Sequence, residues 1–246
     1  MRRRRRLGQH FLLDARYLEP ILVAAQIRPE DQVLEAGTGL GSLTEQLCSE
    51  GAPVMSYEID ASLHEAARAR LGRLRNLRLV VGDAFASTEP FTVFVSNLPF
   101  SASSRFLDWL VVRSFRRAVV TVQREFAYKL RAPPGHRYYR AVSVLAQSRF
   151  QLSEVLRIPR EAFTPPPRVG ASVLVMEPRR PPLTREVVSA VRRVFAYRGR
   201  KLQVALRDLL PATGALPDAL LTRLDNRVER LPPDAAVTAG QLIAAR

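Results

Sequence analysis

Cysteine and histidine are scarce in this chain of 246 residues. Cys48 is the single cysteine, which excludes an internal disulfide and a Cys-x-x-Cys metal site. It falls on the apolar side of a predicted helix, so we expect it in the core. The three histidines, His10, His64 and His136, lack the spacing of metal ligands, and we expect His64 on a solvated helix face. No bound metal is therefore expected.

Long apolar runs are missing as well. The longest ones are far too short to cross a bilayer, which needs about 20 apolar residues in a helix. The arginines at positions 2–6 are followed by Gly8, Gln9 and His10 rather than by the apolar core of a signal peptide. We therefore expect a cytoplasmic protein, with the arginine run either as an arm that touches nucleic acid or as a disordered tail.

Basic residues, in contrast, are in large excess. Lysine and arginine together number 38 against 23 acidic residues, and only Lys129 and Lys201 are lysines. A GC-rich genome would explain arginine over lysine, but it would not explain the excess over acids. Arginine binds phosphate bidentately and stacks on bases, so the charge indicates a nucleic-acid partner. The candidate contacts are Arg113, Arg116, Arg117, Arg124, Arg137, Arg140, Arg198, Arg200 and Lys201.

The order of predicted elements indicates the fold class. Helices and strands alternate from about residue 17 to 178, and the last candidate strands are 153–158 and 171–176. This alternation predicts an α/β fold with a Rossmann-like, doubly wound and mostly parallel sheet. The prolines at 178–182 then break the chain, and the pattern beyond them is helical. We therefore expect a domain at 1–178, with an arm and cap at 1–16, and a small all-α domain at 183–246 that binds RNA or supports the first.

The most informative motif is Asn97-Leu98-Pro99-Phe100, which ends the apolar run 91–96. The asparagine amide has both an acceptor and donors, and the proline stops the strand. The aromatic ring offers a flat face on which a base can stack. These groups suit the exocyclic amine of a planar heterocycle. They point to methyl transfer onto the amino nitrogen of a nucleobase.

A site for a methyl donor is predicted upstream. Residues 32–41 form an apolar strand that runs into a turn with Gly37, Gly39 and Gly41, and 42–49 then follow as a helix. Glycine turns of this kind also fit a dinucleotide. Glu35 lies just before the glycines, where it would repel a pyrophosphate and favour an amino group. Glu58 ends the strand 54–58 and suits the two hydroxyls of a ribose.

A third polar group follows the strand 77–81. Asp83 could accept from an adenine amine, and Ala84 is small enough for a ring to lie flat. Four predicted strands thus each place one polar group near their carboxyl ends, namely Glu35, Glu58, Asp83 and Asn97. Because ligands bind at the carboxyl ends of strands in an open parallel sheet, we expect them at one edge.

Taken together, these stretches resemble the ribosomal RNA adenine dimethyltransferases of the KsgA type, close to archaeal and eukaryotic members. The likeness covers most of the chain, and the set of motifs is highly specific. It rests on residues 7–12, 35–41, 58–60, 82–84, 97–100, 122–125, 143–145, 163–169 and 172–173. The Erm methylases of large-subunit RNA share nearly all of these motifs.

The resemblance implies S-adenosylmethionine as methyl donor and roles for particular residues. The residues that would bind the donor are Gln9, His10, Leu12, Glu35, Gly37, Gly39, Glu58, Ile59, Asp83, Ala84 and Asn97. Asn97, the carbonyl of Leu98, Pro99 and Phe100 would hold the target adenine, and Phe163 in the proline-rich turn would wall that pocket. Thr38 stands where the family often has proline or alanine. Phe100 replaces the usual tyrosine, so it keeps the stacking face and lacks the hydroxyl.

The predicted activity is dimethylation of the N6 amine of two adjacent adenosines in small-subunit ribosomal RNA, within an assembly intermediate and by a monomer. No strong general base is needed, because Asn97 and Leu98 can accept the amine hydrogens. Two alternatives stay open. The first is an Erm-type methylase of large-subunit RNA, and the second is a non-catalytic RNA-binding assembly factor on the same scaffold.

Overall fold

The structure is a computed structural model that describes residues 10–210 and 216–245. The expectations for Gln9 and for the arginine run at 2–6 lie outside the described residues. No helix in the described ranges is both long enough and apolar enough to cross a membrane.

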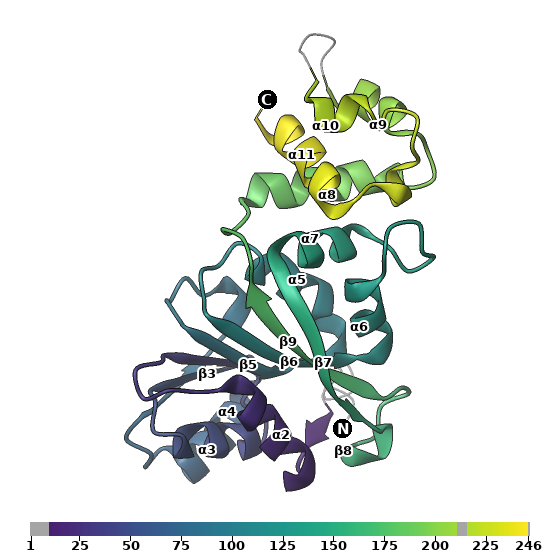
Figure 1. Ribbon diagram of the computed structural model, residues 1–246. Coiled ribbons are helices and arrows are strands. Elements are labelled where there is room, and N and C mark those ends of the chain that lie inside the picture. Colours follow the sequence, from purple (N-terminus) through teal and green to yellow (C-terminus); the bar gives the residue numbers. More distant parts are fainter. Residues whose placement is uncertain (1–9, 211–215, 246) are drawn as a thin grey trace. The chain divides into compact units, whose positions relative to one another are not determined.

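Seven of the described strands form one sheet (Figure 1). In spatial order they are β4 (Leu77–Val81), β3 (Val54–Glu58), β2 (Val33–Ala36), β5 (Val93–Asn97), β6 (Arg117–Gln123), β9 (Ala171–Pro178) and β7 (Phe150–Ile158). The strands from β4 to β6 run parallel, and β9 is antiparallel to β6. In register, Val33 lies opposite Val54 on one side and Val93 on the other. The predicted mostly parallel sheet is therefore confirmed.

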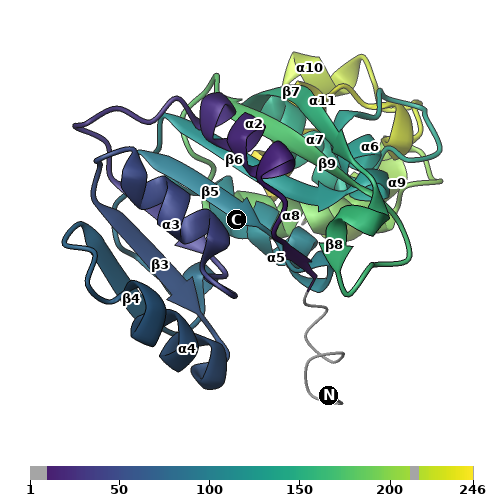
Figure 2. The same cartoon turned by 90° about the horizontal axis from the view of Figure 1, so that it is seen from below.

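The central strands are apolar because both faces of the sheet are covered. Helices α2 (Ala15–Ala25), α3 (Ser42–Ser49) and α4 (Ala61–Leu71) lie over one face (Figure 2). Helix α5 (Ser103–Leu110) begins on the other face. There Phe106 stacks on Phe94 of β5, with the ring centroids 5.4 Å apart. Phe94 and Val95 are fully buried between the two layers.

Short polar side chains determine where two of these helices begin. Asp14 accepts a hydrogen bond from the backbone N–H of Arg16 at the start of α2. Asp60 accepts from the backbone N–H of Ser62 and Leu63 at the start of α4. Each carboxylate thus satisfies amide groups that have no partner inside the helix.

A second, two-stranded sheet brings the start of the described chain to the proline-rich turn. Strand β1 (Phe11–Leu12) pairs antiparallel with β8 (Phe163–Thr164). The side chain of His10 adds a hydrogen bond of 2.7 Å to the carbonyl of Pro165. The proline-rich turn is thus neither helical nor part of a central strand, as expected. The first unit also has single turns of 3₁₀ helix, η1 (Ala84–Ala86), η2 (Phe100–Ala102) and η3 (Arg160–Ala162).

The chain divides into two compact units. The first contains the described residues up to Phe106 with 114–127 and 151–178, and the second contains 107–113, 128–150 and the described residues from 179 on. The helices not yet named are α6 (Arg124–Arg131), α7 (Ala141–Arg149), α8 (Arg185–Ala196), α9 (Leu202–Leu209), α10 (Asp218–Leu221) and α11 (Pro233–Ala244), with the 3₁₀ turn η4 (Val228–Arg230). The expected domain boundary between 178 and 183 stays a prediction.

In the second unit, α11 packs against α8 and α7. The apolar side chains Val188, Val191 and Val194 recur on one side of α8 and are buried there. This spacing is the amphipathic pattern expected of a helix that covers a core. The predicted helical character of the region after Pro182 is therefore observed.

Two residues singled out in the sequence differ in their burial. Cys48 on α3 is buried, as expected. His64 on α4 is only 7 % exposed, so the expectation of a solvated histidine is wrong. Its Nδ1 atom is buried and has no hydrogen-bond partner among the described residues.

Candidate active site

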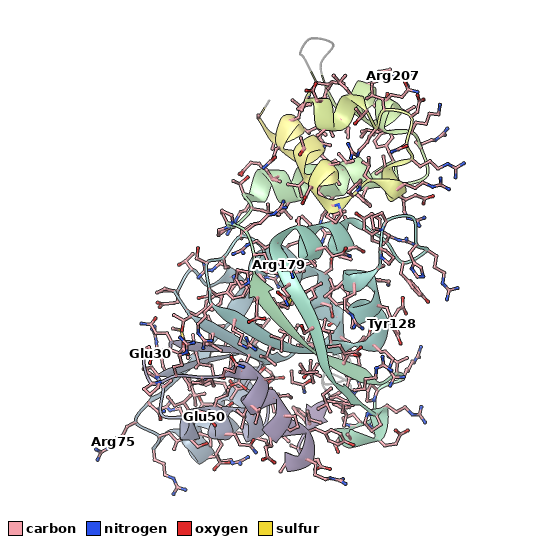
Figure 3. The ribbon with its side chains drawn as sticks, viewed as in Figure 1. Glu30, Glu50, Arg75, Tyr128, Arg179 and Arg207 are labelled. Atoms are coloured by element: carbon pink, nitrogen blue, oxygen red, sulfur yellow. The ribbon has the colours of Figure 1, made fainter. Side chains whose placement is uncertain are left out.

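A pocket lies at the carboxyl ends of the strands in the first unit. Its walls come from the segments that follow β2, β3, β4 and β5. The residues from these segments are Ala36–Leu40, Tyr57–Ile59, Gly82–Phe85 and Asn97–Ala102. Glu30, Glu50 and Arg75, which Figure 3 labels, lie on exposed loops that lead into the opposite ends of strands. The pocket therefore lies at the edge of the sheet where the sequence predicted a ligand site.

The glycine turn after β2 forms one wall. Gly37, Gly39 and Gly41 have φ angles of 88°, 56° and 83°, a conformation that favours glycine. The backbone N–H of Gly37 donates to the carbonyl of Tyr57, and Gly41 begins α3. The turn is thus hydrogen-bonded to β3, and at its glycines it presents backbone atoms without side chains to the pocket.

Glu58 at the end of β3 faces this turn. Its carboxylate accepts from the backbone N–H of Gly39 at 2.8 Å and from that of Asp60 at 3.0 Å. Although Glu58 is only 3 % exposed, it is part of the pocket lining. The carboxylate oxygens in this position can accept further hydrogen bonds from a pair of hydroxyls. Ile59 follows it, 59 % exposed, and offers an apolar surface to the same cavity.

Asp83 and Ala84 follow β4 on the next wall. Asp83 begins the η1 turn, and its carboxylate accepts from the backbone N–H of Phe85 at 2.9 Å. The same carboxylate forms an ion pair with Arg105 of α5, which also lines the pocket. Arg105 was not predicted from the sequence. The available signal was an arginine in the first turn of the helix that follows the Asn97 motif.

The Asn97 motif, at the end of the neighbouring strand β5, forms another wall. The side-chain nitrogen of Asn97 donates to the carbonyl of His10 at 3.1 Å, which leaves the amide oxygen as the acceptor for a ligand. The N–H of Leu98 donates to the carbonyl of Thr121 in β6, so the strand end is fixed on both sides. Asn97, Leu98, Pro99 and Phe100 all line the pocket.

Aromatic rings flank this motif. The Phe100 ring is half-buried, with its centroid 5.5 Å from the His10 ring. Phe163 meets it edge-on at 6.4 Å and is only 2 % exposed. Phe100, His10 and Leu12 line the cavity, whereas Phe163 lies behind them and is not part of the lining. Phe163 therefore supports Phe100 rather than presenting its own face.

Glu35 differs from the other predicted donor residues, because it does not line the pocket. It is fully buried beneath the glycine turn. One carboxylate oxygen accepts from the hydroxyls of Thr44 and Ser56, both at 2.6 Å, and the other has no hydrogen-bond partner among the described residues. Burial raises the pKa of Glu35 to about 7. The Ser56 hydroxyl is also 2.6 Å from that of Thr38, which does line the pocket.

Comparison with known proteins assigns the chain to a family. The model of the family described as ribosomal RNA adenine dimethylase matches residues 1–238. A probable ribosomal RNA small subunit methyltransferase A from Methanosarcina acetivorans is 32% identical over 251 residues, which cover 96% of this chain and 91% of that protein. The chain belongs to the ribosomal RNA adenine dimethylase family.

Solved structures agree with the fold of this adenine dimethylase. A dimethyladenosine transferase from Plasmodium falciparum has a TM-score of 0.79 at 24% identity and covers 94% of this chain and 96% of its own. The 23S rRNA methyltransferase ErmE has a TM-score of 0.68 at 26% identity and covers 94% of this chain and 98% of its own. The fold is thus that of a class I methyltransferase, and the expected resemblance is confirmed.

The basic residues predicted to contact RNA in this adenine dimethylase occupy different surroundings. Arg116 pairs with Asp31 at 2.5 Å, and Arg117 pairs with Glu177 at 2.5 Å. Both arginines lie where β6 begins, at the edge of the sheet away from the pocket. The structure therefore does not bring them to the site. Arg124 begins α6 just after β6 ends, and its backbone N–H donates to Gly170.

The remaining basic residues lie in the second unit. Arg198 pairs with Glu229 at 3.0 Å, and Lys201 pairs with Asp225 at 2.7 Å. The guanidinium of Arg137 lies 4.8 Å from the ring centroid of Tyr138, and Arg200 is exposed. The guanidinium of Arg113 stacks on the ring of Trp109. The guanidinium of Arg140 donates a hydrogen bond to the carbonyl of Tyr139.

No group of three or more His, Cys, Asp or Glu side chains that could hold a metal ion occurs in the described ranges. The walls of the pocket supply a backbone turn, two carboxylates, an amide and aromatic rings instead. This set of groups suits an organic ligand with hydroxyl and amino groups.

Proposed function

We propose that this enzyme dimethylates the N6 amine of two adjacent adenosines in small-subunit ribosomal RNA, with S-adenosylmethionine as donor. One observation carries the proposal. The amide of Asn97, the Leu98 peptide and the Phe100 ring line the same pocket as the glycine turn, Glu58 and Asp83. A base-holding group and a nucleoside-holding group therefore share one cavity, as a transfer between two substrates requires.

The groups in the pocket fit the donor. Glu58 is held by two backbone N–H groups and can accept from the ribose hydroxyls. Ile59 and Ala84 would pack on the adenine ring, and Asp83 would accept from its amine. Gly37 and Gly39 allow close approach of the backbone, while His10 and Leu12 close the methionine side. Glu35 acts from beneath the turn, through Ser56 and Thr38.

The chemistry requires positioning more than proton abstraction. The donor supplies an electrophilic sulfonium methyl group. The adenine amine is a poor nucleophile because its lone pair is delocalised into the ring. The side-chain oxygen of Asn97 and the carbonyl of Leu98 would accept the two amine hydrogens, which favours a pyramidal nitrogen and stabilises its developing positive charge. Phe100 would stack on the base, with Phe163 behind it.

The substrate must present an unpaired base. An amine within a duplex is stacked and paired, so the target adenosine is single-stranded, looped or flipped out. The formal net charge of +15 favours binding to phosphates. We place the RNA contacts on Arg113, Arg124, Arg137, Arg140, Arg198, Arg200 and Lys201. The enzyme acts as a monomer in the cytoplasm, on an assembly intermediate of the small subunit and without a metal.

The fold likeness to ErmE supports a second candidate, a methylase of large-subunit RNA. The two candidates differ only in the RNA they use. Mapping dimethylated adenines in small-subunit and large-subunit particles after the reaction separates them.

The test is transfer of labelled methyl from S-adenosylmethionine to small-subunit particles, followed by nucleoside analysis. We expect N6,N6-dimethyladenosine from the native enzyme. Asn97→Ala should lower the rate by roughly 100-fold or more, because it removes one of the two acceptors of the amine hydrogens. Its affinity for S-adenosylhomocysteine in calorimetry should stay largely intact. Full activity of the variant would remove Asn97 from the catalytic role, and failure of the native enzyme to bind the donor would favour a non-catalytic RNA-binding factor.

A further inference from the structure

Arg105 is a basic residue that lines the pocket and has no role in the proposed reaction. It lies on α5, three residues after the 3₁₀ turn of Phe100–Ala102. Its guanidinium pairs with the Asp83 carboxylate, and its Cζ atom is 6.0 Å from the centroid of the Phe85 ring. The side chain is 62% exposed, whereas that of Asp83 is 23% exposed. Arg105 therefore lies at the mouth of the pocket and reaches inward to Asp83.

The position of Arg105 on its helix makes the ion pair more than a chance contact. A cation in the first turn of a helix faces the positive end of the helix dipole, which is unfavourable. Arg105 is the third residue of α5. Its contacts with Asp83 and Phe85, both from the segment after β4, offset that cost. The pair also joins the helix that follows the Asn97 motif to the strand end that carries Asp83.

The effect on Asp83 follows from the geometry. One carboxylate oxygen accepts from the Phe85 N–H, and the other pairs with Arg105. A carboxylate held at both oxygens has its plane fixed, yet it keeps free lone pairs because each oxygen can accept about two hydrogen bonds. A fixed acceptor discriminates between an amine and a carbonyl on a purine more sharply than a mobile one.

We propose that Arg105 is a positioning residue for the methyl donor, which fixes Asp83 so that the site selects a 6-aminopurine. This inference rests on the proposed function, because Asp83 must be the acceptor for the donor's adenine. It also links the two halves of the site, since a shift of α5 would reach the donor through this ion pair.

The experiment uses two probes, S-adenosylhomocysteine and S-inosylhomocysteine, which carry an amine and a carbonyl at position 6 of the purine. Calorimetry with Arg105→Ala should show a loss of about 5- to 20-fold in affinity for the adenosyl probe. This is less than the roughly 12- to 160-fold expected for complete loss of one hydrogen bond to a charged group, because Asp83 stays in place but is no longer fixed. The affinity for the inosyl probe should change much less. Arg105→Lys keeps the charge and should restore part of the discrimination between the two probes.

A double-mutant comparison shows whether Arg105 acts through Asp83. In an Asp83→Asn background, Arg105→Ala should have little further effect on the adenosyl probe. Arg68→Ala on α4 is the matched control, an exposed ion-paired arginine outside the pocket. It should leave both affinities unchanged.

The outcomes distinguish failure of the proposed function from failure of the role proposed for Arg105. If the native protein binds neither probe, the proposed function fails. If it binds the adenosyl probe and Arg105→Ala binds both probes as tightly as the native protein does, the function stands and the inference is overturned. An equal loss for both probes also overturns it, because damage to the pocket in general would do the same. If Arg105→Ala instead weakens only RNA binding and lowers its salt dependence, Arg105 is a phosphate contact and the inference is again overturned.

Discussion

At the scale of single residues, the buried carboxyl of Glu35 has a measurable consequence. Burial raises its pKa from an ordinary value near 4.5 to about 7. The folded state therefore binds this proton more tightly than the unfolded state does. Stability from this group is fully present below about pH 4.5 and is lost as the pH rises through about 7, with an upper limit of about 3 kcal/mol.

Glu35→Gln removes this pH dependence, because the amide oxygen can still accept from Ser56 and Thr44 while carrying no charge. The gain in unfolding free energy of the variant over the native protein should therefore be larger at pH 8 than at pH 5. Urea unfolding at the two pH values measures it. Glu50→Gln, at an exposed position, is the control and should show no such difference. An equal effect of Glu35→Gln at both pH values would contradict the assignment.

Phe100 tests whether the target base is stacked. Phe100→Ala removes the ring and should lower kcat/KM for the RNA by about 10- to 100-fold, because base stacking on an aromatic ring contributes roughly 1–3 kcal/mol. Phe100→Leu keeps apolar bulk without the flat face, and Phe100→Tyr keeps the face. We expect tyrosine to retain activity and leucine to resemble alanine in steady-state kinetics. Leucine activity equal to that of the native enzyme would show that bulk alone suffices.

Which site residues the sequence could predict depended on their place on the strands. Glu58 and Asn97 are the last residues of their strands, and Asp83 follows one. Parallel strands bring such ends to one edge of the sheet. Glu35 is the residue before the last one of its strand. Because neighbouring side chains of a strand point to opposite faces, its position in the sequence could not show that it is buried beneath the glycine turn rather than exposed to the pocket. Arg105 was missed because its contact with Asp83 spans two segments of the chain.

At the scale of elements, the longer strands were more predictable than the two-residue strands. The predicted strands 54–58 and 77–81 match β3 and β4, because their apolar runs end at polar residues. The two-residue strands β1 and β8 carry no periodicity and form only because distant segments meet. Helix α7 belongs to the second unit, where it contacts α8 and α11.

The contact between α8 and α11 depends on Gly240. A Cβ atom there would lie 2.7 Å from Val191 Cγ2 and 3.3 Å from its backbone nitrogen. Replacing glycine by alanine inside a helix normally stabilises it by about 0.5–1 kcal/mol. Here we expect Gly240→Ala to destabilise the protein by about 1–3 kcal/mol, since the buried Val191 has little room to move.

Thermal unfolding measures the effect of Gly240→Ala. Gly199→Ala is the control, because nothing lies within 4 Å of its added Cβ atom, and it should be neutral or slightly stabilising. A gain in stability for Gly240→Ala would show that the two helices can separate at little cost.

At the scale of the whole molecule, the net charge of +15 should make RNA binding strongly dependent on salt. Each phosphate contact contributes roughly 0.7–0.9 to the slope of log affinity against log salt concentration. The structure divides the arginines into those that are exposed and those that hold the fold. Arg200 is exposed, whereas Arg116 pairs with Asp31, whose side chain is 4% exposed.

Two substitutions should therefore lose different properties. Arg200→Ala removes one phosphate contact and should reduce the salt slope by about 1, with stability unchanged. Arg116→Ala leaves the Asp31 carboxylate with fewer partners. In the native protein, burial raises the pKa of Asp31, but the hydrogen bonds from Arg116, Thr92 and the backbone N–H of Arg28 outweigh burial, so that the pKa is lowered overall. We expect a loss of about 1–3 kcal/mol in unfolding free energy and an unchanged slope. Filter binding across a salt series measures the slope, and urea unfolding measures the stability. A reduced slope for Arg116→Ala at native stability would place the RNA at the edge of the sheet away from the pocket.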